Sequence, residues 1–405
     1  MITKFSSLYA GHVDLGDMGQ DATPTNERRY SNEHLASVFE KTEALARTMD
    51  DLGYYALWLA EHHFQHEGYE VIPNLLMHAV HLSHLTKRLR FGCGFNITPM
   101  WHPLRLAEDF AMADILTGGR VIFGVGRGYH TREVETLGGP LLDANANREI
   151  FEEQVDIVFK AFNQERFSHH GKHYSLPAAV PYRGYELRDI TLVPRPLRRP
   201  VECWQPIVSA SARGLDFMIK HRIRGIIGGG AATMAEGPIQ GYRDAAARAG
   251  LDLKLGEDLC LGIFVHLAET REKAIREMTP WYEEHVKMFA PLGFVPGLNP
   301  EQVRATGKRG GWSHYELARA IGWAVGRRPR VLHLSRRTME LAAKADMRLR
   351  GGRARLTLDR VGYMVHPDWV VSQGARVPGE LWRPRIETRA GLKATAAWYR
   401  EQGWL

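Results

Sequence analysis

The chain has 405 residues, of which 44% are hydrophobic, so it is long and apolar enough to build a large core and is not disordered throughout. Its three cysteines, Cys93, Cys203 and Cys260, form no CxxC pair, which excludes a disulfide framework and favours a reducing compartment. The sequence begins with no leader-like segment, and no uncharged run approaches the about 18 residues that cross a membrane. We expect a cytoplasmic protein with no membrane partner.

The net charge of +7 is unevenly distributed along the chain. Residues 308–405 contain 20 Lys and Arg against 8 Asp and Glu, a net charge of +12, whereas residues 1–307 carry a net charge of −5. A nucleic-acid site would need basic residues on one face with aromatic residues between them. A solvated cationic surface on helical segments explains the tail more simply, so we expect no nucleic-acid partner.

Short apolar runs alternate with longer helical patterns over the first three hundred residues, which is typical of an α/β protein with parallel strands. This alternation favours a TIM (β/α)8 barrel that is one strand short of closure, because a doubly wound fold would place a Gly-rich turn after its first strand. The predicted strands are Lys4–Tyr9, Tyr55–Ala60, Leu89–Phe95, Val121–Val125, Val201–Val208, Gly225–Ile227 and Leu259–Val265. The predicted helices are Asn32–Leu52, Asn74–Leu85, Leu104–Leu116, Ala146–Asn163, Ala212–His221, Gly237–Ala249 and Thr270–Met288, the last capped by Thr270.

Three motifs follow predicted strands, where parallel barrels carry their chemistry. Glycines at a strand end let a planar ring approach the backbone, and an arginine beside them can pair with phosphate. The third motif is a poor dinucleotide loop, because its third glycine is misplaced. In order, the motifs are Glu61-His62-His63-Phe64, His102-Pro103-Leu104-Arg105-Leu106-Ala107-Glu108-Asp109 and Gly119-Arg120-Val121-Ile122-Phe123-Gly124-Val125-Gly126-Arg127-Gly128.

Taken in this order, the motifs resemble the bacterial luciferase-like flavin monooxygenases over about residues 1–305. The resemblance continues through Asn147-Arg148 with Phe151-Glu152-Glu153 and through Ser209-Ala210-Ser211. It implies a barrel that binds reduced FMN, supplied by a separate flavin reductase, at the carboxyl ends of its strands. In such enzymes O2 adds to the flavin to give a C4a-peroxide or hydroperoxide, which oxygenates a small organic substrate that is apolar or carries a carbonyl. The family commonly oligomerises, so a homodimer is also expected.

The first motif favours the luciferase and alkanal monooxygenase branch over deazaflavin-dependent enzymes. The resemblance implies catalytic roles for His62, which would handle protons beside the flavin, and for His63, which would line the same pocket. Adjacent histidines at a strand end are alternatively packing residues. His63 and His66 lack a third ligand at a diagnostic spacing, so we expect no metal.

The resemblance also implies residues that bind the flavin ring. Gly94, Phe95 and Asn96 match the segment beneath the isoalloxazine, where the family often has a non-prolyl cis peptide, so we expect an unusual backbone there. Asn96 either offers its amide to the ring edge or is a turn residue. Gly126 stands where luciferase itself has a reactive cysteine, so light emission is not implied. Tyr129 is expected to cover the ring.

For the FMN phosphate, the resemblance implies Arg148 together with Ser209, Ala210 and Ser211, because arginines and a helix N-terminus suit a dianion. Arg127 is a third candidate. Each serine alone is an ordinary helix cap. The matched residues His102, Arg105, Glu108 and Asp109 are interpreted as structural, with Arg105 paired along one helix face.

Two segments lie outside this scheme. Phe167–Arg199 is long for a connection and is expected to cover the pocket, with Tyr182 and Tyr185 as wall residues. The basic tail, residues 308–405, resembles the C-terminal lobe of an extended short-chain dehydrogenase of the epimerase type, but it lacks that family's catalytic motif. Either Arg330–Leu334 supplies the missing strand, or the tail forms its own helical appendage. If the barrel stays open, a degenerate, non-catalytic flavin-binding protein is the alternative to an enzyme.

Overall fold

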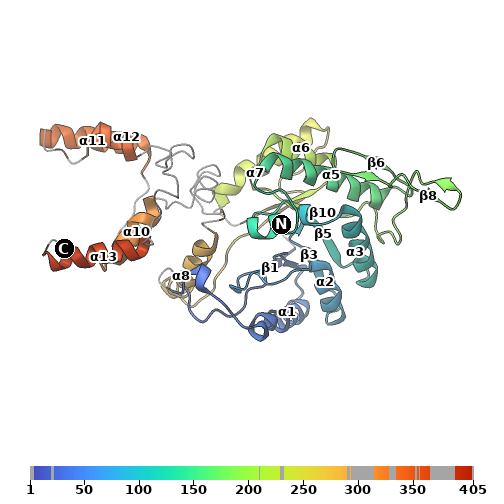
Figure 1. Cartoon of the computed structure of the whole chain (residues 1–405), viewed down its shortest axis with the longest axis horizontal. Coiled ribbons are helices and arrows are strands. Elements are labelled where there is room, and N and C mark those ends of the chain that lie inside the picture. Colours follow the sequence, from blue (N-terminus) through green and yellow to red (C-terminus); the bar gives the residue numbers. More distant parts are fainter. Residues whose placement is uncertain are drawn as a thin grey trace, which may run out of the picture. The chain divides into compact units, whose positions relative to one another are not determined.

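A parallel β-sheet forms the centre of residues 4–288 (Figure 1). Its strands lie in the order β1-β2-β3-β5-β10-β11-β12, and the short strand β4 pairs with β5. The seven predicted strands are all present, most of them shorter than predicted. Their bounds are β1 Ser6–Tyr9, β2 Ala56–Leu59, β3 Arg90–Cys93, β4 Asn96–Ile97, β5 Val121–Gly126, β10 Cys203–Pro206, β11 Arg224–Ile227 and β12 Leu259–Leu261.

The computed structural model describes residues 4–19, 22–208, 210–228, 232–289, 292, 314–327, 334–351, 354, 356–364 and 388–403. The chain divides into two units, Met1–Met288 and Phe289–Leu405. The predicted boundary between residues 307 and 308 lies outside the described residues.

The sheet has the strand order of a barrel. Within the described residues, no pairing joins its first strand, β1, to its last strand, β12. The absence of an eighth strand stays a prediction. The segment expected to fill the gap, Arg330–Leu334, lies outside the described residues except for Leu334, which belongs to no strand.

Helices alternate with the strands as predicted. Ser31, Asn74 and Asp143 cap the helices that follow them by accepting backbone N–H groups, and Thr270 accepts the N–H of Lys273 at 3.2 Å. The short helix α4 and the 3-10 turns η1 Thr25–Glu27 and η2 Thr98–Met100 were not predicted. The helix bounds are α1 Asn32–Asp51, α2 Leu75–His84, α3 Pro103–Leu116, α4 Thr131–Thr136, α5 Ala144–Asn163, α6 Ala212–Lys220, α7 Ala232–Arg248 and α8 Arg271–Phe289.

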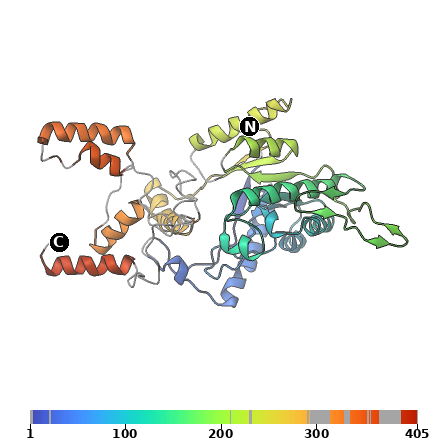
Figure 2. The same cartoon turned by 45° about the horizontal axis from the view of Figure 1, so that its top comes forward.

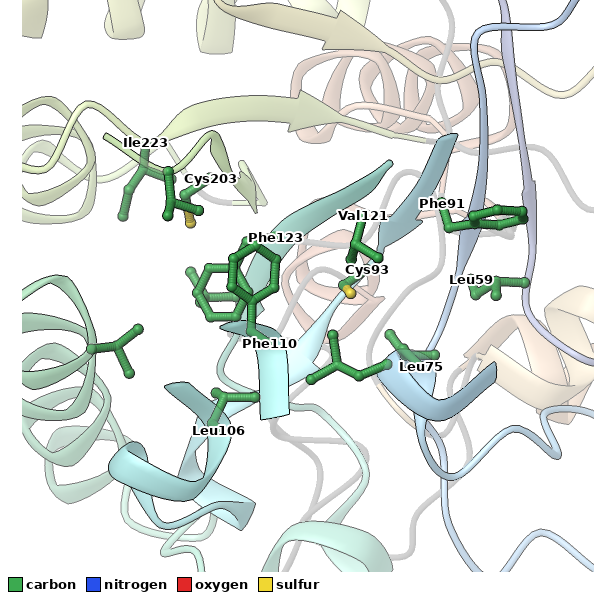
Figure 3. Close-up of a cluster of buried hydrophobic side chains, with 14 of the residues drawn as sticks. Leu59, Leu75, Phe91, Cys93, Leu106, Phe110, Val121, Phe123, Cys203 and Ile223 are labelled. Carbon is green, nitrogen blue, oxygen red and sulfur yellow. The ribbon is translucent and has the colours of Figure 1, made fainter. Parts of the chain in front are cut away.

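Both faces of strands β2, β3 and β5 are buried, and alternate side chains of each strand point to opposite sides. On the helix side, Leu59, Phe91, Val121 and Phe123 pack with residues of α2 and α3 (Figure 3). The other face carries a second apolar cluster built from Ala56, Trp58 and Ile122, against which Trp204 packs. Because the strands are parallel, their carboxyl ends lie at the same edge of this sheet.

Ion pairs tie three strands of the sheet together near their amino ends. The carboxylate of Glu202, just before β10, lies 3.1 Å from Arg90 of β3 and 2.6 Å from Arg224 of β11. Arg224 also lies 2.9 Å from Asp258. Because these half-buried charges are paired across strands, they help to hold the amino ends of the strands together. The carboxyl ends, where parallel barrels carry their active sites, lie at the opposite edge of the sheet.

The long insertion folds into two small hairpins rather than an unstructured connection. The strands are β6 His169–His170 with β7 Ser175–Leu176, and β8 Pro181–Tyr182 with β9 Tyr185–Glu186. The second hairpin projects away from the helices in both views (Figures 1 and 2). The ring centroids of Tyr182 and Tyr185 lie 5.7 Å apart. The two residues are 45% and 55% exposed, so their rings do not form the predicted pocket wall.

The second unit is helical where it is described. Helix α10, His314–Ala324, and helix α13, Thr388–Glu401, are joined by a hydrogen bond from Arg400 to the carbonyl of Ala324 at 3.2 Å. The bounds are α10 His314–Ala324, α11 Arg336–Arg350, α12 Leu358–Met364 and α13 Thr388–Glu401. A search of the described residues finds no helix with the length and apolar character to cross a membrane.

Candidate active site at the carboxyl ends of the strands

A buried network of polar side chains follows strands β2 and β5. Its members, here called the His62 network, are His62, Gln65, Glu70, Tyr129, His130 and Glu133. The loop after β2 turns sharply at Gly68, whose φ is +78° and where a Cβ atom would lie 2.5 Å from Val13. Only glycine fits such a turn without strain. The turn brings Glu70 back beside His62.

Both ring nitrogens of His62 are engaged. Its Nδ1 lies 3.2 Å from Oε2 of Glu133 on α4, and its Nε2 lies 3.2 Å from Oε1 of Glu70. The hydroxyl of Tyr129 is 3.1 Å from the same Nε2. Gln65 donates to Glu133 at 2.8 Å and to Glu70 at 3.1 Å, so it holds the two carboxylates in place.

The charges of the network favour a protonated His62. Burial by itself would lower the pKa of His62, but the carboxylates of Glu70 and Glu133 outweigh it and raise that pKa above its ordinary value. Burial would raise the pKa of Glu133, yet its hydrogen bond and charge interaction with His62 lower it. Burial and both carboxylates raise the pKa of Tyr129 well above its ordinary value. The tyrosine therefore stays a neutral hydroxyl.

His63 is directed away from this network by Glu61. The carboxylate of Glu61 lies 3.2 Å from Nε2 of His63 and accepts the indole N–H of Trp101 at 2.8 Å and the backbone N–H of Ile97 at 2.7 Å. Glu61 thus joins the end of β2 to β4 and the turn after it. The two histidines predicted to share a pocket have different carboxylate partners.

The residues predicted to lie beneath the ring form the end of β3 and β4. The peptide bond between Gly94 and Phe95 is cis, at the position where the resemblance implied one. Asn96 is buried and donates its amide to the carbonyl of Gly124 at 2.9 Å, so its Nδ2 ties β4 to β5. A contact of Asn96 with a flavin stays a prediction.

Glycines of β5 make room for this segment. A Cβ atom at Gly124 would lie 1.9 Å from the carbonyl oxygen of Cys93, and one at Gly126 would lie 3.1 Å from Ile97 and 3.2 Å from Phe95. Since Ile97 is also the register partner of Gly126, the two strand ends lie side by side. The glycines thus let the ends of β4 and β5 pack closely together, and both strands are buried.

The predicted phosphate residues meet at the start of α6. Ser211 caps this helix by accepting the N–H of Gly214 at 3.3 Å. A Cβ atom on Gly214 would lie 3.7 Å from a guanidinium nitrogen of Arg148, which places Arg148, from α5, beside the first turn of α6. Ala210 has a left-handed φ of 44°, and Ser209 lies outside the described residues. A positive charge and a helix N-terminus therefore coincide, as a phosphate requires.

One contact links the phosphate residues to the His62 network. Asn147, buried at the start of α5 and adjacent to Arg148, donates its amide to the carbonyl of Arg127 at 3.2 Å. Arg127 ends the β5 motif two residues before Tyr129. This hydrogen bond connects the helix that carries Arg148 to the loop that carries Tyr129.

Glu70, His130, Glu133 and Gln65 are site residues that sequence reasoning missed. Two of them could have been found from their spacing. His130 and Glu133 are three residues apart just after a strand, a spacing that places two side chains on the same face of a short helix. The structure supports the structural interpretation of Arg105, which pairs with Glu108 at 2.7 Å and Asp109 at 3.2 Å on the exposed face of α3.

The comparison of this fold and site with known proteins identifies a family. The sequence model described as luciferase-like monooxygenase matches residues 19–326, about three quarters of the chain. The chain belongs to this family of oxidoreductases, many of which are flavoproteins. The resemblance of the tail to a short-chain dehydrogenase is not supported by these comparisons and stays a prediction.

Individual relatives agree with this assignment. The oxygenase component of a flavin-dependent trigonelline monooxygenase from Acinetobacter baylyi is 27% identical over 43% of this chain and 44% of its own length. An alkanal monooxygenase alpha chain from the Kryptophanaron alfredi symbiont is 29% identical over 35% of this chain and 38% of its own. The match thus spans less than half the length of these relatives.

Solved structures agree on the fold. The oxygenating constituent of 3,6-diketocamphane monooxygenase from Pseudomonas putida, solved with FMN, has a TM-score of 0.57 at 17% identity over 74% of this chain and 80% of its own. An F420-dependent secondary alcohol dehydrogenase has a TM-score of 0.51 at 14% identity over 76% and 82%. At these identities the likeness extends to the fold alone.

Proposed function

We propose that this protein is a flavin-dependent monooxygenase that uses reduced FMN and O2 to oxygenate a small organic substrate, apolar or carrying a carbonyl group. The observation that carries the proposal is the coincidence of three features at one end of the sheet. They are the positive charge of Arg148 at the start of α6, the glycines that bring the strand ends of β4 and β5 together, and the buried His62 network.

The side chains at the start of α6 fit the phosphate of FMN. Arg148 supplies the charge, and Ser211 with the free N–H groups of the first turn supplies donors. Gly94 and Gly126 suit the ring, because a planar group can approach backbone where there is no side chain, and Phe95 lies beside them. Arg127 and Tyr129 are the remaining candidates for contact with the cofactor.

Reduced flavin supplies the two electrons with which O2 is activated, and the protein supplies binding, orientation and protons. His62 is the residue proposed to give and take the proton. Its Nδ1–H is held by Glu133, so the exchangeable proton is the one at Nε2. The side chain is only 5% exposed, which keeps bulk water away from the reacting centre.

The partners follow from the chemistry. A site that uses reduced flavin needs a source of reducing equivalents, and the trigonelline relative is named as an oxygenase component, which supports a separate flavin reductase for this chain. Cytoplasmic location and pairing into a homodimer stay predictions.

The proposal is tested with purified protein, chemically reduced FMN and O2. We expect FMN to bind and the protein to change the rate of flavin reoxidation, with one oxygen atom entering a carbonyl or apolar test substrate in 18O2. A His62→Gln variant should bind FMN with unchanged affinity and lose the oxygenated product. Normal FMN binding without any product from a panel of ketones, aldehydes and alkanes would favour the degenerate, non-catalytic flavin-binding barrel.

A deazaflavin-dependent oxidoreductase is the second candidate, because one structure of the same fold uses F420. Titration of the protein with FMN and with F420, followed by fluorescence, separates the two. At least tenfold tighter binding of F420 would replace the FMN proposal.

A further inference from the structure

Glu70 lies between two histidines. Its Oε1 is 3.2 Å from Nε2 of His62, and its Oε2 is 3.3 Å from Nε2 of His130. One carboxylate therefore bridges an imidazole that follows β2 and another that begins α4. Two imidazoles joined through a carboxylate form an unbroken path of proton acceptors and donors.

The hydroxyl of Tyr129 connects the same groups a second time. It lies 3.4 Å from Oε2 and 3.2 Å from Oε1 of Glu70, and 3.1 Å from Nε2 of His62. A hydroxyl can accept one proton while it donates another. Tyr129 therefore offers a route from the Oε2 side of Glu70 to His62 that needs no rotation of the carboxyl group.

The ends of this path differ in exposure. The side chain of His130 is 10% exposed, against 5% for His62, 4% for Glu70 and 3% for Glu133. His130 immediately precedes α4. Among these four side chains His130 has the most contact with solvent, and Tyr129, the remaining member of the path, is half-buried.

We infer that His130, Glu70 and Tyr129 form a proton relay that connects solvent to Nε2 of His62. A proton from water is taken up at Nδ1 of His130, whose Nε2 proton passes to Oε2 of Glu70. That proton then moves to the hydroxyl of Tyr129 as the hydroxyl's own proton passes to Nε2 of His62. One proton enters and one arrives, every bond broken is replaced, and neither Tyr129 nor Glu70 changes its final charge.

Two neighbouring contacts direct the proton along this path. Glu133 holds Nδ1 of His62, so incoming protons reach the ring at Nε2. Gln65 donates to Oε2 of Glu70 at 3.1 Å, which holds the carboxylate that lies between the two imidazoles. The raised pKa of Tyr129 agrees with the scheme, because the hydroxyl exchanges protons in one concerted step without forming a phenolate.

The inference rests on the proposed function for its purpose, but its test does not. In flavin-free protein labelled with 15N-histidine, the exchange of the His62 ring proton with water is measured by magnetisation transfer at pH 7. We expect Tyr129→Phe, which keeps the ring, and His130→Gln each to slow this exchange at least tenfold. The controls Tyr54→Phe and His81→Gln, on exposed side chains outside the network, should leave the exchange within twofold of the parent.

The direction of the change separates a relay from a structural role. A substitution that merely loosens the network admits water and speeds the exchange, whereas a severed relay slows it. Unchanged or faster exchange in Tyr129→Phe overturns the inference, whether or not the protein oxygenates anything. If His130→Gln does not fold, Tyr129→Phe decides alone.

A second readout applies once turnover is available. His130→Ala should slow the proton-dependent step at least tenfold with FMN affinity unchanged, and added imidazole should restore at least half of the rate, because a free imidazole can occupy the space and carry the proton. No rescue by imidazole, together with unaltered exchange at His62 in the flavin-free protein, would exclude the relay. Loss of product without any change in His62 exchange would count against the inference and leave the monooxygenase proposal standing.

Discussion

Nδ1 of His62 lies 3.2 Å from Oε2 of Glu133, although 71 residues separate the two in sequence. The contact joins the loop after β2 to α4, and both side chains are buried. A carboxylate in this position fixes which ring nitrogen carries the proton and stabilises the imidazolium form. The state of the proposed proton handler is therefore set by a residue of another motif.

Replacing Glu133 by glutamine should lower the pKa of His62 by at least about one unit. The amide keeps the shape and can still accept the Nδ1 hydrogen bond, but it removes one of the three carboxylate charges, those of Glu70, Glu133 and Glu61, that hold His62 protonated against burial. Titration of 15N-labelled histidine by NMR between pH 5 and 9 measures the change. Glu135→Gln, on the exposed side of α4, is the matched control, and an equal shift there would refute the assignment.

Arg148→Ala should weaken FMN binding by roughly 10- to 100-fold, because a charge-assisted hydrogen bond to phosphate is worth about 1.5–3 kcal/mol. Riboflavin, which lacks the phosphate, should bind the variant and the parent within twofold. Fluorescence titration measures both affinities. Arg166→Ala, at a 72% exposed side chain paired with Asp189, serves as the control. Equal losses for FMN and riboflavin would show that Arg148 does not contact phosphate.

The order of the helices and strands could be predicted from the sequence, because hydrophobic periodicity and turn-forming residues depend only on neighbouring positions in the chain. Thr270, predicted as a helix cap, accepts the N–H of Lys273, and each strand of the sheet was an apolar run between turn signals. The two hairpins of the insertion were missed because each strand has only two residues, too few to show alternation.

The site was harder to predict because its partners are distant in sequence. His62, Arg148 and Ser211 were found through motifs. Glu70 was missed because its approach to His62 depends on the left-handed turn at Gly68. A single glycine among polar residues does not indicate the direction in which the chain turns. The opposite orientations of His62 and His63 follow from the positions of Glu133 and Glu61, which no local pattern encodes.

Gly124→Ala should destabilise the fold by more than about 2 kcal/mol, because the new methyl group would meet the carbonyl oxygen of Cys93 at 1.9 Å and the backbone there has little freedom to move. Urea unfolding measures the loss. Gly237→Ala is the matched control, since a Cβ atom there meets nothing within 4 Å and lies in a helix, where alanine is preferred. A loss below about 0.5 kcal/mol at Gly124 would contradict the packing described for β5.

His78 should make the protein less stable in acid. Burial lowers its pKa to about 4, and neither ring nitrogen has a hydrogen-bond partner. Because the folded pKa lies below the unfolded value of about 6.5, the unfolded chain binds more protons between these values, and stability falls as the pH drops from about 6.5 to 4. This group alone contributes up to about 3 kcal/mol over that window.

His78→Leu should therefore flatten part of the acid dependence and raise the melting temperature at pH 5, since leucine fills a similar volume without a titrating group. Thermal unfolding followed at several pH values checks this. His84→Leu, at an exposed side chain at the end of the same helix, should leave the profile unchanged. An unaltered profile in His78→Leu would mean that His78 is solvated when protonated.

Glu284 anchors α8 to the segment after β1. Its buried carboxylate accepts the N–H of Gly19 at 3.0 Å and the hydroxyl of Tyr69, and it pairs with Arg28 at 3.1 Å and with Lys287 at 2.9 Å. Tyr69 precedes Glu70, so the anchor lies next to the His62 network in sequence.

Glu284→Gln should cost about 2–4 kcal/mol of unfolding free energy, because it leaves the buried Arg28 and Lys287 facing a neutral amide while the shape is kept. Arg28 retains Asp17 at 2.8 Å, which keeps the loss at the lower end of that range. Urea unfolding measures the change, with Glu272→Gln in the exposed first turn of α8 as the control, expected within about 0.5 kcal/mol of the parent. Equal stability of Glu284→Gln and Glu272→Gln would show that α8 is held by its apolar contacts and that the charges around Glu284 contribute nothing net.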